Sequence, residues 1–511
     1  MPRFAAAAED CKKCYAGMLD PARASRRRNR GWTASRRVPY RRAMTASPTA
    51  DLARELTDRC TALVNRRKVV LVGGVLAGAT PRVRQLRQWG ASDVLVLAQG
   101  VGTGELPGHD EARTLVIEGR KAESLTEESR SWVQFAADPP AAARTAVDDF
   151  DPDRTALCLL GAFAQVDRYC GRESLGGRTP AIAALEDKSL NDALWDAAGV
   201  TRAPACVVPT DRQSLLDAAR DLDRGHGTVW SADASDGMNG GGDRVRWVRT
   251  PSDAEDALNL MLPRTRQVRL MPFLEGVPCS IHGFVLPDGV AVFRPVEQVI
   301  LRSGADSRFV YAGISTWWDP SDGDREQMRE VARRVGRHLR VSEDFRGGYS
   351  VDGILTGDGF RPTELNPRFS GGLNAIAKGV PDLPLELLQG ATMRGIDVGA
   401  TAAGLESLLV EAADANRYGS AYTMSDLAPP AQTETIQVTG GPEGLRVAGH
   451  DENVVGILDR GPAALGSLIR FIPTAMTSGS RLAPYAVSAF ALTDLLWGTG
   501  FGALEPARDV R

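Results

Sequence analysis

The sequence predicts a mixed α/β protein, α+β in part, with a doubly wound N-terminal domain and a small C-terminal α+β domain. A chain of 511 residues exceeds one hydrophobic core, so about three domains are expected. Early apolar runs alternate with amphipathic helical patterns, as in parallel β-α-β units. A glycine-rich hairpin and short antiparallel strands occupy the second half. The expected domains are a disordered basic leader at 1–50, an α/β domain at 51–175, a middle domain at 176–395 with two subdomains split near 275, and an α+β domain at 396–511.

Composition fits a globular protein, with 43% hydrophobic residues, 24% charged residues and a net charge of -3. Charge is unevenly distributed, because residues 1–43 carry a net +9 and the remainder about -12. An acidic body argues against nucleic acid as the partner. The leader could be a nucleic-acid arm, a transit peptide, or upstream sequence translated before the true start at Met44. The last interpretation is favoured, because no apolar stretch or helical face organises the leader.

The chain shows no segment that predicts a membrane span. The longest apolar run, Tyr485 to Trp497, is short and contains Asp494, so a buried helix is expected. Cysteine usage also points to the cytoplasm, because the cysteines are scattered singly. The exception is a lone CxxC at 11–14, which has no second half for a zinc site. The other cysteines are expected to be reduced and in or near the core: Cys60, Cys158, Cys170, Cys206 and Cys279.

The first domain begins with an amphipathic helix over 51–65. An unbroken apolar run from Lys68 to Val72 predicts a buried parallel strand, and a helix over 81–89 and a strand over 93–97 complete a β-α-β unit. Gly73 to Gly78 does not match the dinucleotide fingerprint. Further strands are expected at 114–117 and 156–160.

The middle domain is expected to open with one helix from Ala181 to Ala197 that carries Lys188 near its start. Residues 232–243 are too rich in Gly and Asp for regular structure. Around that loop we expect strands at 206–208, 227–231, 245–248 and 267–271, with helices at 211–222 and 254–262. Strands at 280–285 and 291–299 and a helix at 325–339 follow. Beyond Leu388 the pattern weakens to short antiparallel strands at 434–459.

The most informative segment is a predicted hairpin, Tyr349 to Leu355 and Phe360 to Arg368, joined by a glycine-rich turn. Alternation along a strand puts Glu364 and Asn366 on one face, and pairing can bring Asp352 alongside them. These oxygen donors suit Mg²⁺, which takes further ligands from substrate phosphates. Arg368 follows on the same face, where its planar fork can hold a phosphate. The alternative is a surface hairpin with solvated acids.

Three other features accompany the hairpin. Of 61 basic residues only six are Lys, so Lys188 inside a motif is informative as a phosphate-binding cation. The loop around Gly240 and Gly241 can fold over a triphosphate, because glycines let backbone N–H groups approach closely. The stretch Pro272 to Gly276 offers an apolar hinge whose backbone can read an adenine edge.

This order of phosphate lysine, phosphate loop, adenine hinge and metal carboxylates resembles the ATP-grasp superfamily of carboxylate-amine ligases over about residues 180–395. The resemblance implies an ATP-grasp fold, preceded by that family's pre-ATP-grasp domain. It implies Mg²⁺, or Mn²⁺ as the alternative, at Asp352, Glu364 and Asn366. It implies catalytic roles for Arg368 and Lys188. ATP would contact Lys188, Asp236, Asn239, Gly240, Gly241, Met271, Phe273 and Glu275, with Pro278 as a competing alignment for the ribose role of Glu275.

The chain departs from the family pattern at one place. Family members carry a second lysine on the strand before the glycine-rich loop, where this chain has Val229, Trp230 and Ser231. Trp230 could line the nucleotide pocket, and the missing charge could come from Arg244, Arg246, Arg294 or Arg302. The loop and the extra C-terminal region look like the pheganomycin-type peptide ligases of antibiotic biosynthesis.

The function implied is an ATP-dependent ligase that forms an amide or peptide bond. It would activate a small carboxylic acid or amino acid as an acyl phosphate, join it to an amine or peptide N-terminus, and release ADP and phosphate. A homodimer is one option for its assembly. The alternatives are a non-catalytic ATP-binding scaffold and a small-molecule kinase. A protein nucleophile is not needed, and no Ser/His or Cys/His constellation is visible.

Overall fold

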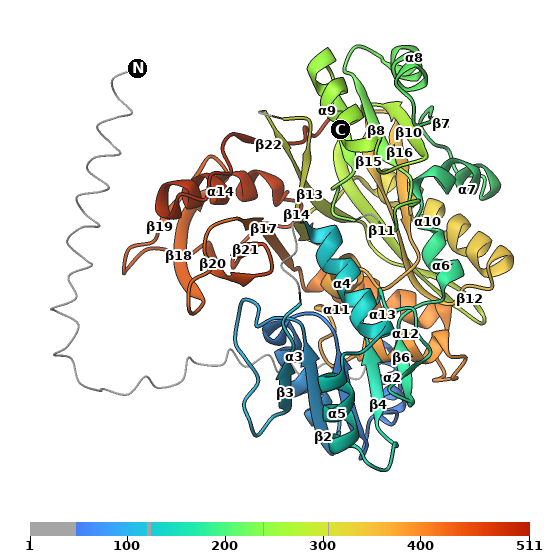
Figure 1. Ribbon diagram of the computed structural model, residues 1–511, viewed down its shortest axis with the longest axis vertical. Coiled ribbons are helices and arrows are strands. Elements are labelled where there is room, and N and C mark those ends of the chain that lie inside the picture. The colour runs from blue at the N-terminus through green and yellow to red at the C-terminus, as the bar shows by residue number, and fades with distance from the viewer. Residues whose placement is uncertain (1–47, 120–123, 239, 305) are drawn as a thin grey trace. The chain divides into compact units, whose positions relative to one another are not determined.

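The structure, a computed structural model, describes residues 48–119, 124–238, 240–304 and 306–511. The prediction of a disordered basic leader falls outside these residues, except that 48–50 begin helix α2. Among the described residues the strands form three sheets, with helices between them (Figure 1). The predicted mixed α/β class is confirmed.

The first sheet lies in the N-terminal part of the described chain and has the order β3-β2-β1-β4-β6-β5, parallel except for β5. Helix α3 begins at Leu76, ahead of the predicted start at Pro81, because the amides of Leu76 and Ala77 donate to the carbonyls of Gly100 and Val101. The elements are α2 (Pro48–Thr61), β1 (Lys68–Val72), α3 (Leu76–Gln88), β2 (Asp93–Ala98), β3 (Arg113–Val116), α4 (Leu125–Ala137), α5 (Ala141–Phe150), β4 (Leu157–Leu160), β5 (Arg168–Tyr169) and β6 (Arg172–Gly176).

The second sheet is antiparallel, with the order β7-β10-β8-β9, and two helices cover one of its faces. Its elements are β7 (Cys206–Pro209), α8 (Arg212–Leu222), β8 (Thr228–Ala232), β9 (Val245–Val248), α9 (Pro251–Met261) and β10 (Gln267–Pro272). Strand alternation places Trp230 in the core with α8 and α9, and turns Val229 and Ser231 to the opposite face.

The single helix predicted over 181–197 is wrong. The segment forms α6 (Pro180–Ala184), the 3-10 turn η2 (Lys188–Leu190) and α7 (Asn191–Ala197). The Asp187 carboxylate accepts the Ser189 N–H at 2.9 Å and the Ala234 N–H at 3.1 Å, which ends one helical segment and starts the next. Lys188 therefore lies on a tight turn beside the second sheet.

The third sheet has twelve strands and runs from β16 through β11 and β14 to the C-terminal strands. The strand predicted over 291–299 is interrupted at Arg294 and Pro295, because proline cannot donate to the ladder. The elements are β11 (Val277–Leu286), β12 (Gly289–Val292), β13 (Val296–Ser303), β14 (Phe309–Ser315), α10 (Asp322–Ser342), β15 (Gly347–Thr356), β16 (Gly359–Asn366), α11 (Gly371–Ala377), α12 (Leu385–Met393), α13 (Ala402–Ala415), β17 (Gly419–Ser425), β18 (Glu434–Gly441), β19 (Gly444–Val447), β20 (Gly456–Ala463), β21 (Gly466–Pro473), α14 (Ala483–Trp497) and β22 (Leu504–Pro506).

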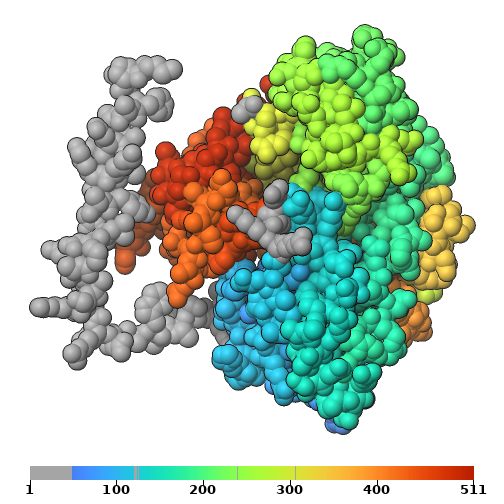
Figure 2. Space-filling view, in the orientation of Figure 1, coloured from blue at the N-terminus to red at the C-terminus, as the bar shows by residue number. Residues whose placement is uncertain are grey.

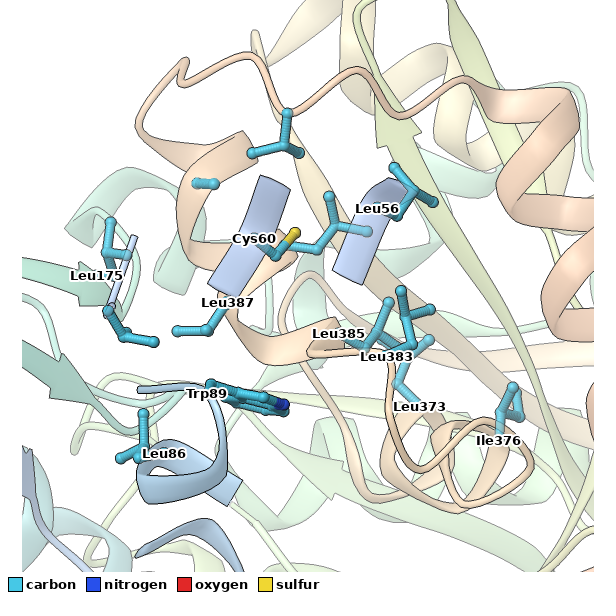
Figure 3. Packing of buried hydrophobic residues seen from close by; sticks show 14 of the residues in the cluster. Leu56, Cys60, Leu86, Trp89, Leu175, Leu373, Ile376, Leu383, Leu385 and Leu387 are labelled. Atoms are coloured by element: carbon cyan, nitrogen blue, oxygen red, sulfur yellow. The ribbon is translucent and has the colours of Figure 1, made fainter. Parts of the chain in front are cut away.

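The large sheet buries both faces near β11 and β15. Val277, Cys279 and Ile281 pack on one side with α10. On the other side, Leu373 and Leu385 of α11 and α12 share a core with α2 and α3 of the N-terminal domain, as Figure 3 shows around Leu56, Cys60 and Trp89. Burying each such side chain contributes about 1.5–3 kcal/mol. This shared core holds the first sheet against the large sheet.

The cysteines and the apolar run near the C-terminus lie as predicted. Cys60, Cys158 and Cys279 are buried, Cys170 and Cys206 are half-buried, and these five are free thiols. Helix α14 packs on strands of the C-terminal region. Within the described ranges, no helix combines the length and apolar character that a membrane crossing requires.

Candidate functional site

A cavity of about 550 Å³ lies between the second sheet, one face of the large sheet and helix α4. In Figure 2 the blue and cyan surface of the N-terminal domain meets the green surface of the region that follows it. Strand alternation selects the lining, because Pro278, Ser280 and His282 of β11 face the cavity while their neighbours face α10. Two sheets and one helix therefore line a single cavity.

The predicted hairpin lies at one end of this cavity. Asp352 on β15 pairs directly with Glu364 on β16, and the register shifts by one residue just beyond this pair. The Nδ2 group of Asn366 donates to Asp352 Oδ2 at 3.0 Å, and Ser280 Oγ donates to Asp352 Oδ1 at 2.6 Å. The structure thus brings Asp352, Glu364 and Asn366 together on the cavity wall.

Asp352 is the most perturbed acid of the group. Protein surrounds it, although its side chain keeps some exposure to the cavity. Burial raises its pKa to about 6, the Glu364 charge adds to the rise, and hydrogen bonds from Ser280 and Gln298 oppose it. A divalent cation bound between two such close carboxylates would offset their mutual repulsion.

Lys188 lies across from this acidic pair. Its Nζ is 2.8 Å from Glu364 Oε1, and its side chain is 12% exposed. The turn η2 holds it there, since Asp187 caps that turn. The lysine and the acidic hairpin therefore meet although 176 positions separate them in the chain.

Arg368 completes this end of the cavity. Its Nε donates to Glu186 Oε1 and its Nη2 to Asn366 Oδ1, both at 2.7 Å, while the guanidinium lies 4.5 Å from the Phe163 ring centroid. Arg178 also pairs with Glu186. Burial alone would raise the Glu186 pKa, but Arg368 and Arg178 outweigh it and hold the pKa below its usual range. The Arg368 fork is thus fixed in orientation beside the acids.

The donor set fits a magnesium ion. Two carboxylates and one amide oxygen are hard ligands, and a phosphate would complete the coordination. Asn366 now turns its nitrogen to Asp352 and its oxygen to Arg368, so ligation by the amide requires a rotation. Among the described residues no cluster of three His, Cys, Asp or Glu could hold a metal, so this site depends on the amide and on substrate oxygens.

Only part of the glycine-rich loop lines the cavity. Gly240 and Gly241 line the cavity, and Asp236 points away to an ion pair with Arg244 at 2.5 Å. Asn239 lies outside the described residues. The loop is tied to helix α4, because Thr126 Oγ1 lies 3.1 Å from the Gly240 carbonyl oxygen and 3.2 Å from the Gly240 nitrogen.

The expected adenine end holds an aromatic stack. Met271 and Phe273 line the cavity, and Trp247 stacks on Phe273 with centroids 4.1 Å apart. The Phe273 N–H donates to the Gly227 carbonyl at 3.0 Å, so it is not available to an adenine edge in this conformation. Glu275 accepts two hydrogen bonds from Arg302, at 2.6 and 3.1 Å, so the carboxylate expected at the ribose is already paired.

The structure shows what stands near the missing second lysine. Trp230 has no exposed surface and donates to Thr228 Oγ1 at 2.9 Å, so the expectation that it lines the pocket is wrong. Of the four arginines considered, Arg302 lines the cavity, and Arg294 is buried against Asp319 and Asp414. Arg244 and Arg246 line a neighbouring pocket.

Arg269 was not predicted and lines the cavity as the direct cross-strand neighbour of Ser231. Its guanidinium is held by Asp192, with hydrogen bonds of 2.9 and 2.7 Å. It therefore places a cation on β10, the strand beside β8, where a second lysine was expected.

Further lining residues escaped the sequence analysis. On β11, Ser280 and His282 could have been found from alternation, since every second residue of that strand lies on the same face of the sheet as Asp352. Burial lowers the His282 pKa to about 3, so its ring is neutral. The others come from β13, β17 and α4: Gln298, Tyr422, Glu128, Ser129 and Trp132.

Glu128 is the most unusual of these side chains. It is 8% exposed and lines the cavity from helix α4 one turn before Trp132. Burial raises its pKa. Among the described residues no group forms a hydrogen bond or ion pair with its carboxylate. A buried carboxylate facing an open space is suited to a cationic ligand.

No protein-family model matches the chain, and no curated protein matches it. Solved structures similar to it include an ATP complex of carboxyaminoimidazole ribonucleotide synthase from Aspergillus clavatus, at 14% identity and a TM-score of 0.46, covering 85% of this chain and 99% of that one. Phosphoribosylamine–glycine ligase from Thermotoga maritima is similar at 14% identity and a TM-score of 0.46, covering 86% and 97%. An L-amino acid ligase from Bacillus licheniformis is similar at 10% identity and 0.44, covering 80% and 94%. Likeness at this level assigns no activity to the chain.

Proposed function

We propose that the protein is an ATP-grasp ligase that uses ATP to join a carboxylic acid to an amine. The observation that supports this most is the meeting of Asp352, Glu364 and Asn366 with Lys188 and Arg368 at one end of a single cavity. A cavity of about 550 Å³ also falls within the roughly 300–1,000 Å³ typical of small-molecule sites.

Asp352, Glu364 and Asn366 would hold Mg²⁺, or Mn²⁺ as the alternative, which neutralises phosphate charge when bound. Lys188 now pairs with Glu364, and the phosphates of ATP offer it a stronger anionic partner. Gly240 and Gly241 would approach the phosphates through their backbone, and Met271 and Phe273 would lie along the adenine.

The reaction proceeds in two transfers. One oxygen of the substrate carboxylate bonds to the γ-phosphorus while the bond from that phosphorus to the bridging oxygen breaks, which gives an acyl phosphate and ADP. The amine nitrogen then bonds to the acyl carbon, the carbon–oxygen bond to phosphate breaks, and the amine loses its extra proton to solvent. Arg368, oriented by Glu186 and Asn366, is placed to hold the transferring group.

The finer proposal is that acid and acceptor are amino acids or peptides. The unpaired carboxylate of Glu128 supports this, since an ammonium group would compensate its buried charge. The still narrower proposal is a pheganomycin-type peptide ligase of antibiotic biosynthesis. It rests on the unusual loop around Asp236 and on the C-terminal strands that extend the large sheet.

The test is a screen of amino acids and short peptides for ADP and phosphate release, with the coupled product identified by mass. ADP release that requires both an acid and an amine supports the proposal. AMP release would redirect it to adenylation. Phosphorylated acid formed without amine would indicate a kinase, and tight ATP binding without turnover, unchanged by Asn366→Ala, would indicate a scaffold.

A further inference from the structure

A second pocket, also of about 550 Å³, adjoins the cavity and is lined by five arginines. We call it the arginine pocket; its cations are Arg130, Arg244, Arg246, Arg264 and Arg308. It lies where helix α4, the glycine-rich loop, the end of α9 and strands β13, β14 and β17 meet. Two of its lining residues are acids, Glu127 and Asp243.

The cavity and the arginine pocket share lining residues. Gly241, Gly242, Phe309, Tyr311 and Met424 contribute to both. A substrate that reacts beside Arg368 can therefore extend past the glycine-rich loop toward the arginine pocket. The loop is anchored on this side, because Arg130 donates to the Met238 carbonyl at 3.1 Å and Thr126 contacts Gly240.

Two of the arginines lack an acidic partner. Asp236 pairs with Arg244 and more distantly with Arg130, and Asp306 pairs with Arg308. Among the described residues no carboxylate lies within 4.0 Å of Arg246 or Arg264, and both side chains donate to backbone carbonyls.

Burial strengthens the argument at Arg246 and Arg244, whereas Arg264 is exposed. Desolvation lowers the pKa of Arg246, and the nearby charge of Arg308 adds to the effect. The side chain of Arg244 is 10% exposed, and its Nη1 finds no hydrogen-bond partner. Guanidinium groups that are partly desolvated and incompletely bonded favour an anion with several oxygens.

We propose that the arginine pocket binds the anionic end, a carboxylate or a phosphate, of the amine substrate. The inference rests on the proposed ligase function and narrows its acceptor to an anionic amine, such as an amino acid or peptide with a free carboxylate, or a phosphorylated amine. Arg246 and Arg264 supply the two guanidinium groups of this pocket that have no carboxylate partner among the described residues.

The test is calorimetric binding of phosphate and succinate to the full chain, without turnover. The double variant Arg246→Gln/Arg264→Gln is expected to weaken both by about tenfold or more, since each contact to the anion is charge-assisted. Arg224→Gln removes one charge from an exposed position between α8 and β8, outside the arginine pocket. It should change neither the phosphate affinity nor the succinate affinity. ATP affinity should stay the same in all variants.

Paired probes identify the source of the anion. Alanyl-alanine binding better than its C-terminal amide indicates a carboxylate, and O-phosphoethanolamine binding better than ethanolamine indicates a phosphate. If the double variant does not fold, each single variant is measured against wild type, and a loss of anion affinity in each is expected.

Equal anion affinity in wild type and variant, no binding of any anionic probe, or a parallel fall in ATP affinity would each overturn the inference. Failure of the ligase proposal shows separately, as an absence of ADP release with every acid and amine, because the binding measurements require no reaction.

Discussion

Asp352 and Glu364 lie directly opposite each other on neighbouring strands, so two carboxylates share one end of the cavity. Protein groups partly compensate the pair, with Ser280 on one acid and Lys188 on the other. Burial and the Glu364 charge still raise the Asp352 pKa to about 6. A cation bound between these two acids would offset the repulsion between their charges.

Glu364→Gln and Asn366→Ala are each expected to lower kcat for ADP release by about 100-fold or more, because each removes a ligand and a partner of Lys188 or Arg368. Circular dichroism and melting temperature should match wild type. Glu343→Gln alters an exposed acid that follows α10 and should retain full activity. Full activity in both site variants would remove the metal assignment.

Magnesium binding is expected to depend on pH through Asp352. Its pKa in the folded protein, about 6, exceeds the usual 3.8, so protonated Asp352 stabilises the metal-free fold at low pH. That contribution is lost as pH rises through 6, where the ionised acid becomes ready for the cation. Added MgCl₂ should raise the melting temperature at pH 7.5 and have little effect at pH 5. A shift of equal size in Asp352→Asn at pH 7.5 would contradict this.

Arg368→Lys keeps the charge and loses the planar fork that joins Glu186 and Asn366 and lies over Phe163. We expect kcat to fall by about 100-fold while the KM for ATP changes by less than about threefold. Steady-state kinetics with the acid and amine found in the screen measure both. A raised KM for ATP with unchanged kcat would instead assign Arg368 to nucleotide binding.

Glu128→Gln should raise the KM for the ammonium-bearing substrate by about tenfold or more, because a buried ion pair with the substrate becomes a neutral contact. The KM for ATP should not change. Asp138→Asn, an exposed acid at the end of the same helix, is the matched control. Identical kinetics of the two variants would exclude Glu128 from substrate recognition.

Trp230→Phe tests the placement of that side chain in the core. It removes buried surface and the hydrogen bond to Thr228, so the free energy of unfolding should fall by about 1–3 kcal/mol. Since Trp230 does not reach the cavity, the KM for ATP should be unchanged. Urea denaturation and ATP kinetics on one preparation give both values; a large change in KM without a loss of stability would return Trp230 to the pocket.

Local patterns predicted much of the fold. The apolar run at Lys68 and the alternating hairpin at Asp352 carry their structure in short segments, and both formed as strands. The helix around Lys188 was mispredicted because a side-chain cap at Asp187 outweighed the helical spacing of leucines. Helix α3 was predicted to begin too late, at Pro81. It begins at Leu76, because carbonyls of the loop after β2 accept hydrogen bonds from the first amides of the helix.

The site was less predictable where distant segments meet. The contact between Arg368 and Glu186 joins residues 182 positions apart, and Glu128 comes from helix α4, which carries no functional motif. Alternation puts Trp230 and Ser231 on opposite faces of β8, but it does not say which face α8 and α9 cover. Spacing along one strand is local information, whereas the element that covers a strand is decided by the whole topology.

The continuity of the large sheet limits how the chain can be shortened. Strand β17 pairs with β14 at Gly313 to Ser315, and Ala507 reaches the cavity lining. A truncated version that stops near residue 416 would leave one edge of β14 unpaired, and strands of other molecules could pair with it. Such a fragment should aggregate on expression, so activity assays and crystallisation need the C-terminal strands in place.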